Sequence, residues 1–528
     1  MPTPSDCPEI ALPDRSTEVQ AILPPASILK LMAATAVLLF VCSSLRHLMF
    51  QSTGFDLGIY DQVTYLISQG QPPISSILGF HHLGNHGAWS VYPLALFYKL
   101  FPTVYWLLGI QAIALSLGAW PVWGLVRQAE LSPSLAKAVA IIYLLYPVIF
   151  NVNLFDFHPE VMALPALLAA ILAARRGNVL GFSLAILWVL GCKAVLSLTV
   201  TALGFWLLFF ERRVAKNRRI CGLIGLAMGV SWFIVVTQVM IPSFSGEEAA
   251  GVWRYTYLGD SVLEILLNFF LKPQLVWGRL FMMPTLDYLY KLSLPVIWWL
   301  SPQALMPLIP AIPTLVINSL SEVPFQRSLA FQYSIPVIPF LLLAVIESFH
   351  RSSQNLSNWT LGSAARQLWQ RMQSQPSDKP QNIFQALMAQ TLIARWRLPQ
   401  YVMLWSLLIF LVYGKYGHFW VYLNRLDNWS ALRSAVIQVQ PQGSVLTDNR
   451  LAPHFTHRPN VKLLSQVTLE SDLAEFDYIV LNLRHPWPDT QELGTSLAQN
   501  LSRPNSPNAL SFQTIYEQDD VLVFQNGS

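Results

Sequence analysis

Long apolar runs, separated by short polar segments, form most of this chain. The first run, residues 28–50, exceeds the roughly 20 residues that a helix needs to cross a bilayer. Prolines interrupt several later runs, so broken helices are expected there. The pattern predicts about eleven spans, at residues 28–50, 104–126, 138–152, 161–174, 179–191, 195–210, 221–241, 286–300, 303–320, 332–349 and 399–423.

Polar segments divide the chain into parts. We expect a cytoplasmic tail at 1–27, a membrane domain at 28–349 with outer loops at 51–103 and 242–262, and a cytoplasmic linker at 350–398. After the last span at 399–423, residues 424–528 have the composition of a small soluble domain with alternating strand segments. The predicted fold is therefore an α-helical polytopic membrane protein with a small C-terminal extracytoplasmic α/β domain.

Basic residues indicate the orientation of the spans. Arg175, Arg176 and the segment 211–219 lie in loops that alternate with loops poor in Lys and Arg. The positive-inside rule then places the N-terminus in the cytoplasm and the C-terminal domain outside, in a multi-pass protein of the plasma (inner) membrane.

Composition changes this picture little. Only 12% of the residues are charged, against about a quarter in soluble proteins, so the bilayer itself is an expected partner. The net charge of +4 is not gathered on one face, and no nucleic-acid partner is expected.

The first outer loop carries acidic residues directly after a span. Phe55, Ile59 and Val63 recur at helical spacing, which predicts an amphipathic helix lying in the membrane interface. Asp56 and Asp61 are about 140° apart on such a helix, so they have different roles. Asp56 is either a general base for an acceptor hydroxyl or a cap of this helix. Asp61 is a candidate for substrate binding.

The same loop contains a cluster of histidines. His82 and His86 are four residues apart and, together with Asp56, could hold a divalent metal ion. The alternative is an ordinary hydrogen-bonded loop.

Further polar residues interrupt the apolar pattern elsewhere. Asp156, His158 and Glu160 alternate in the second outer turn, as a binding edge or as a polar turn before the next helix. Lys193 stands alone on an apolar hairpin, where it either holds a lipid phosphate or extends to the interface. Gln332 and Tyr333 open a span and could line the same cavity as Lys193.

Several of these segments resemble one family. The sequences GFDLGIYDQ, LFDFHPE and FQYSIPVIPF are similar to those of the multi-pass family called domain of unknown function 2079, over most of the chain from residue 54. Its architecture is similar to that of the GT-C glycosyltransferases, which take a polyprenyl-phosphate sugar at an outer cavity. The resemblance implies that Asp56 is the catalytic or metal-associated acid, and that Asp156, His158 and Glu160 line the cavity. The residues after Lys193 depart from the family, which commonly has acids where this chain has Ala194 and Val195.

Three functions compete on this evidence. The preferred one is a membrane glycosyltransferase that moves a sugar from a lipid-linked donor to an unspecified acceptor at the outer face. A transporter or lipid flippase would show paired charges within spans and internal repeats, which the sequence lacks. A non-catalytic assembly protein would tolerate the loss of the Asp56 carboxylate.

Overall fold

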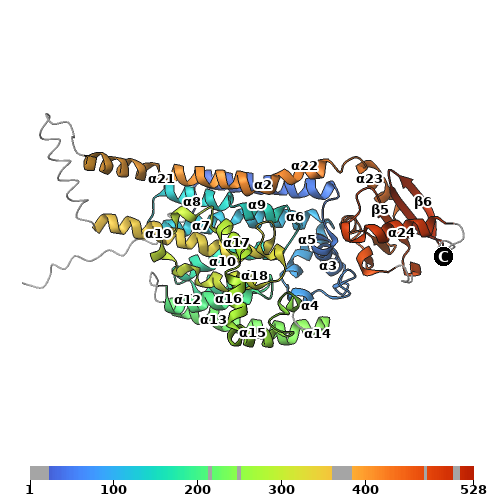
Figure 1. Cartoon of the computed structure of the whole chain (residues 1–528), viewed down its shortest axis with the longest axis horizontal. Helices are drawn as coiled ribbons and strands as arrows, with labels where there is room; N and C mark the ends of the chain where they lie inside the picture. Colours follow the sequence, from blue (N-terminus) through green and yellow to red (C-terminus); the bar gives the residue numbers. More distant parts are fainter. Residues whose placement is uncertain are drawn as a thin grey trace, which may run out of the picture.

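The computed structural model describes residues 23–211, 217–246, 251–358, 383–468, 473–503 and 512–527. Most of the predicted N-terminal tail, residues 1–22, and the middle of the predicted linker, residues 359–382, lie outside these ranges. Within them, helices form an elongated body, and a small sheet lies at one end of it (Figure 1).

The helical body has the length and composition of a membrane protein. Six of the described helical stretches are long and apolar enough to cross a membrane: Ala26–Leu48, Tyr105–Gln128, Pro133–Asn153, Arg218–Ser245, Gln332–Ser352 and Leu398–Leu423. Shorter apolar helices accompany them at Val91–Leu100, Val179–Leu190, Leu196–Phe209, Val262–Leu271 and Met306–Leu320.

The first half of the body runs through fourteen short and long elements. In chain order these are α2 (Ala26–Leu48), η1 (Gly54–Gly58), α3 (Ile59–Ser68), β1 (Ile74–Ser75), β2 (Phe80–His81), α4 (Leu83–His86), α5 (Val91–Leu100), α6 (Tyr105–Leu117), α7 (Ala119–Gln128), α8 (Pro133–Leu144), α9 (Pro147–Asn153), α10 (Glu160–Arg175), α11 (Val179–Leu190) and α12 (Leu196–Phe209).

The second half contains more broken helices. Its elements are α13 (Arg218–Val235), η2 (Val236–Met240), α14 (Ile241–Ser245), η3 (Val252–Tyr255), α15 (Val262–Leu271), α16 (Pro273–Leu280), α17 (Met283–Ser293), η4 (Ile297–Trp299), η5 (Pro302–Ala304), η6 (Met306–Ala311), α18 (Ile312–Leu320), η7 (Pro324–Arg327), η8 (Gln332–Val337), α19 (Ile338–Asn358), α21 (Ile383–Tyr413), η9 (Lys415–Gly417) and α22 (His418–Leu423).

Prolines divide two of the predicted spans. Residues 286–300 form the end of α17 and the separate turn η4, with Pro295 between them. Residues 303–320 begin with the 3-10 turns η5 and η6, and Pro310 lies inside η6. A proline lacks the N–H that a continuing helix needs, so each stretch breaks as the sequence suggests.

The helix of the first outer loop exists, but its surroundings differ from the expectation. Most residues of α3 are buried, whereas the amphipathic pattern predicts a helix lying flat on the membrane. The reason is contact with the C-terminal part of the chain. Gln62 Nε2 donates to the Arg458 carbonyl over 3.1 Å, and Ser76 Oγ donates to the Val461 carbonyl over 2.7 Å. The polar face of the helix therefore meets protein rather than headgroups.

The C-terminal part is a five-stranded sheet with a helix on each face. Its strand order is β4-β3-β5-β7-β6, and β3 pairs in parallel with β4 and β5, while β7 is antiparallel to β5 and β6. Its elements are α23 (Trp429–Gln438), β3 (Val445–Thr447), η10 (Ala452–His454), β4 (Val461–Leu463), η11 (Leu464–Gln466), η12 (Leu473–Glu475), β5 (Tyr478–Asn482), η13 (Pro488–Thr490), α24 (Gln491–Ser502), β6 (Phe512–Gln518) and β7 (Val521–Asn526).

Alternating side chains divide the core of this sheet in two. Val445, Val480 and Val523 pack with α23 on one face. Ile479 and Phe524 pack with α24 on the other. This is the period-two pattern of strands that are covered on both faces.

A buried polar cluster joins the sheet to the helical body. The Asp61 carboxylate accepts hydrogen bonds from Tyr98 Oη at 2.5 Å, from Thr456 Oγ1, and from His457 Nε2 at 3.3 Å. The His457 ring also stacks on Tyr65, with 4.6 Å between ring centroids. Asp61 and its partners therefore hold α3, α5 and the loop after η10 together.

This joint should depend on pH. Burial raises the pKa of Asp61, but His457, Thr456 and Tyr98 outweigh it, so the pKa lies below 3.8. Burial lowers the pKa of His457, but Asp61 outweighs it, so the pKa lies above 6.5. The His457 contribution to stability is therefore complete below pH 6.5 and is lost as the pH rises through the raised pKa, whereas the Asp61 contribution is lost only as the pH falls below 3.8.

We expect His457→Gln to lower the Tm of the full chain in detergent at about pH 6 more than at about pH 9. The matched control is His418→Gln, because His418 is exposed and lies outside the joint. A Tm difference from wild type that is the same at both pH values would contradict the role of the Asp61–His457 pair.

Candidate functional site

A buried ion pair fixes the two predicted outer turns relative to each other. Arg46, in the last turn of α2, contacts Asp156 through both terminal nitrogens, with Nη2 3.2 Å from Oδ2. Asp156 Oδ2 also accepts from the Thr53 backbone N–H at 3.1 Å and from Thr53 Oγ1 at 2.8 Å. Asp156 has a φ of 146°, which is costly for a residue with a side chain. These contacts hold it in that conformation.

The contacts of Arg46, Thr53 and Asp156, called the clamp below, bring Asp56 and His158 together. The π-helical turn η1 presents Asp56, and His158 Nε2 lies 3.0 Å from its Oδ1. The His158 ring stacks on Phe155, and its backbone N–H donates to Gln111 Oε1 at 3.2 Å. The two turns, which the sequence predicts to lie on the outer face, therefore contact each other.

Each group of this pair favours the charged form of the other. Burial raises the pKa of Asp56, but the charge and hydrogen bond of His158, followed by the charge of Lys193, bring it below its ordinary value of 3.8. Burial lowers the pKa of His158, but Asp56 and Glu160 bring it above 6.5. Asp56 is thus a carboxylate that the His158 ring orients.

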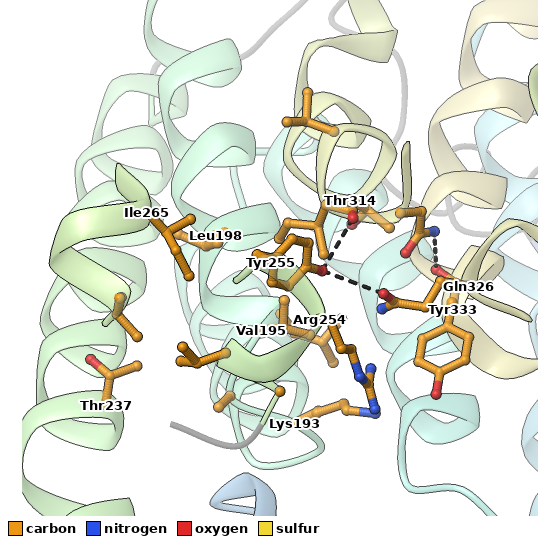
Figure 2. A pocket seen from close by; sticks show the side chains of 18 of the residues that line it. Lys193, Val195, Leu198, Thr237, Arg254, Tyr255, Ile265, Thr314, Gln326 and Tyr333 are labelled. Atoms are coloured by element: carbon orange, nitrogen blue, oxygen red, sulfur yellow. Dashed lines mark hydrogen bonds between the residues drawn. The ribbon is translucent and has the colours of Figure 1, made fainter. Parts of the chain in front are cut away.

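A cavity of about 400 Å³, shown in Figure 2, is lined by Lys193 and Glu160. The charge of Lys193 acts on Asp56, and Glu160 is two residues after His158, so the cavity lies near Asp56 and His158. Its larger part is apolar and is formed by side chains of α12, α13, α15 and α18, with η3 across it. Figure 2 shows Leu198 and Ile265 on this side, away from Lys193 and Arg254. The apolar lining residues include Val195, Leu198, Phe233, Ile265, Leu266, Phe269, Val316 and Ile317.

The other end of the cavity is charged. Lys193 forms an ion pair with Glu160, and its Nζ lies 5.7 Å from the centroid of the Tyr333 ring. The Arg254 guanidinium lies 5.6 Å from the same ring, and Figure 2 shows both cations pointing to one region. Burial, followed by Lys193 and Arg254, holds the pKa of His86 well below 6.5, so this lining residue is neutral.

The turn that carries Lys193 is docked on the first outer loop. The Ala194 N–H donates to the His86 carbonyl at 2.8 Å, and the Ser90 N–H donates to the Gly191 carbonyl at 2.9 Å. Gly191 packs so closely on Trp89 that a Cβ there would lie 2.3 Å from a ring carbon. Glycine is therefore required at this position, and the docking sets where Lys193 enters the cavity.

The structure brings together only some of the residues that the sequence nominates. His86, Glu160, Lys193, Gln332 and Tyr333 line the cavity, with Asp56 and His158 beside it. Two nominated acids do not line it, because their carboxylates are engaged elsewhere. Asp61 bonds to the C-terminal part of the chain, and Asp156 bonds to Arg46 and Thr53.

The predicted metal site finds little support in this arrangement. His82 is buried beside His81 and Tyr92, and neither of its ring nitrogens has a hydrogen-bond partner among the described residues. Among all the residues that the structure describes, no group of three His, Cys, Asp or Glu side chains could hold a metal ion. A divalent metal stays a prediction, and no step proposed below passes through one.

Sequence reasoning did not assign two important cations. Arg254 lies in an outer loop, and its only signal is that it stands among apolar and aromatic residues with few other basic ones. Arg46 ends the first span like any membrane-flanking arginine. Its partner Asp156 is 110 residues away, so the sequence alone does not reveal the pairing.

The chain matches a known protein family over most of its length. A family model described as "Predicted membrane protein (DUF2079)" matches residues 46–523. The chain belongs to this family. No protein of curated function matches the DUF2079 chain. The family resemblance of the sequence motifs is thereby confirmed.

Solved structures show the fold of this DUF2079 member. ArnT from Cupriavidus metallidurans, crystallised with undecaprenyl phosphate, is similar over 94% of this chain and 97% of ArnT, with a TM-score of 0.51 and 15% identity. The apo form of the same ArnT covers 93% and 98%, with a TM-score of 0.47 and 14% identity. The DUF2079 chain thus has an ArnT-like helical membrane fold.

The clamp predicts a specific pattern of stability. Arg46→Met should lower the Tm of the full chain by several degrees, because it leaves the Asp156 carboxylate buried without its counter-charge, at a cost of about 3–5 kcal/mol. The double variant Arg46→Met with Asp156→Asn should recover part of this loss.

The matched control is Lys462→Met, which breaks the exposed Lys462–Glu475 pair. It should change the free energy of unfolding by at most about 1 kcal/mol. A Tm for Arg46→Met equal to that of the control would show that the clamp does not hold the two turns.

Proposed function

We propose that this chain is a membrane glycosyltransferase that uses a polyprenyl-phosphate-linked sugar at the outer face of the membrane. The cavity is the observation that carries the proposal. It combines an apolar volume, which suits a prenyl chain, with two cations at one end, which suit a phosphate. The oriented carboxylate of Asp56 stands beside the charged end.

The roles of the residues follow from this arrangement. Lys193 and Arg254 bind the donor phosphate and stabilise the charge that it gains as the sugar leaves. Asp56 accepts the proton of the acceptor hydroxyl as that oxygen attacks the anomeric carbon and the bond from that carbon to the phosphate oxygen breaks. His158 orients Asp56 and keeps it ionised.

Two further observations support the donor class and the outer face. ArnT, whose fold this chain shares, was crystallised with undecaprenyl phosphate, which is a polyprenyl phosphate. Arg175 and Glu211, at the ends of α10 and α12 away from the cavity, flank loops rich in Lys and Arg. The positive-inside rule places those loops in the cytoplasm and hence the cavity and the C-terminal sheet outside. The acceptor is a hydroxyl-bearing molecule on that side.

Asp56→Asn tests the proposal directly. The amide keeps the size of the side chain but cannot take the proton, so we expect the rate of sugar transfer to fall by about 10²- to 10⁴-fold. The assay follows the loss of labelled sugar from a polyprenyl-phosphate hexose in membranes that contain the full chain. The lipid product is measured as released polyprenyl phosphate.

Asp260→Asn serves as the matched control, because Asp260 is an exposed acid of another outer loop and does not line the cavity. It should leave the transfer rate unchanged. Transfer by Asp56→Asn at the wild-type rate would favour a non-catalytic role for the protein.

A further inference from the structure

Two hydrogen-bond acceptors at the charged end of the cavity stand without a donor. Glu160 and Gln332 line the cavity and are each only 4% exposed. Glu160 Oε1 contacts Lys193, but Glu160 Oε2 and Gln332 Oε1 have no hydrogen-bond partner among the described residues. Buried acceptors are nearly always paired in proteins, so this pair points to donors that a ligand supplies.

The position of these acceptors restricts what the ligand is. Glu160 contacts Lys193, and Gln332 directly precedes Tyr333, whose ring centroid lies 5.7 Å from Lys193 Nζ. Both acceptors therefore belong to the charged end, where the proposed phosphate binds. A group that reaches them must be attached close to the phosphate and must carry hydroxyl or amino hydrogens. A sugar bonded directly to the phosphate meets both requirements, whereas a bare polyprenyl phosphate meets neither.

The charge of the cavity limits the number of phosphates. Among the residues that the structure describes, the charged side chains that line it are Lys193, Arg254 and Glu160, which leave one excess positive charge. The neighbouring Asp56 carboxylate lies 3.0 Å from His158 Nε2. Burial lowers the pKa of that imidazole, but the carboxylate outweighs burial and raises the pKa, which favours a balanced pair. A phosphodiester carries one negative charge and would neutralise the site, whereas a diphosphate brings more negative charge than the site can balance.

We propose that Glu160 and Gln332 form the sugar-recognition site and that the donor joins its sugar to the prenyl chain through a single phosphate. This inference rests on the proposed function and makes its substrate class narrower. Glu160 thereby has two contacts, one to Lys193 and one to the sugar, so it links the position of the sugar to that of the phosphate.

The test measures the affinity of the full chain in nanodiscs for three probes. These are a polyprenyl phosphate, the polyprenyl diphosphate of the same chain length, and a polyprenyl-phosphate hexose. We expect the hexose-linked lipid to bind about tenfold more tightly than the bare phosphate, which corresponds to about one or two additional hydrogen bonds. The diphosphate should bind more weakly than the hexose-linked monophosphate.

Two variants separate the parts of the inference. Gln332→Met should reduce the preference for the hexose-linked lipid, read as the ratio of the two monophosphate affinities. Glu160→Gln removes one negative charge from the site, so the affinity for the diphosphate should rise relative to that for the bare monophosphate.

The matched control is Gln326→Met, since Gln326 also lines the cavity but its Oε1 already faces the Tyr255 hydroxyl at 3.5 Å. It should keep the wild-type preference for the hexose.

The outcomes distinguish this inference from the proposed function. Equal binding of the bare and hexose-linked monophosphates by the wild type would overturn the sugar site and leave the lipid-phosphate site in place. Tighter binding of the diphosphate would overturn the single-phosphate argument. Failure of the wild type to bind any of the three lipids would overturn the proposed function itself.

Discussion

The contact between Arg46 and Asp156 is the constraint on which the site depends. Both side chains are buried at the edge of an apolar body, where a lone charge is far more costly than a paired one. The pair joins the end of α2 to the turn before α10, and Thr53 completes it with two hydrogen bonds. Because these two backbone segments are held side by side, Asp56 and His158 are brought into contact.

The cavity is assembled from segments that lie far apart in the sequence. Lys193 comes from the turn between α11 and α12, Arg254 from the 3-10 turn η3, and Tyr333 from the start of η8. Each cation lies near the same tyrosine ring, which has a negative face that favours positive charge. The charged end therefore gathers beside an aromatic ring, and apolar side chains line the rest of the cavity.

The C-terminal part of the chain also contacts the turn η1, which carries Asp56. The Gly54 N–H donates to the side chain and the carbonyl of Asn449, and a Cβ on Gly54 would lie 3.0 Å from Ala452. The turn η1 is thus held between the clamp at Asp156 and the loop after β3. Asp61, in the following helix α3, accepts hydrogen bonds from Thr456 and His457 of the same C-terminal part. The orientation of Asp56 follows from both parts of the molecule together.

The sequence by itself determined the membrane helices, the breaks at prolines and the two polar turns in which the candidate residues stand. These features are local, because the length of an apolar run and the scarcity of charge can be read without knowing any partner. Tertiary structure alone decided how the charges are used. Asp156 and Asp61 became structural, and α3 became buried, through partners 110 and 395 residues away. Arg254 and Lys193 came together because the fold brings both beside the Tyr333 ring. The distance along the chain does not show such contacts.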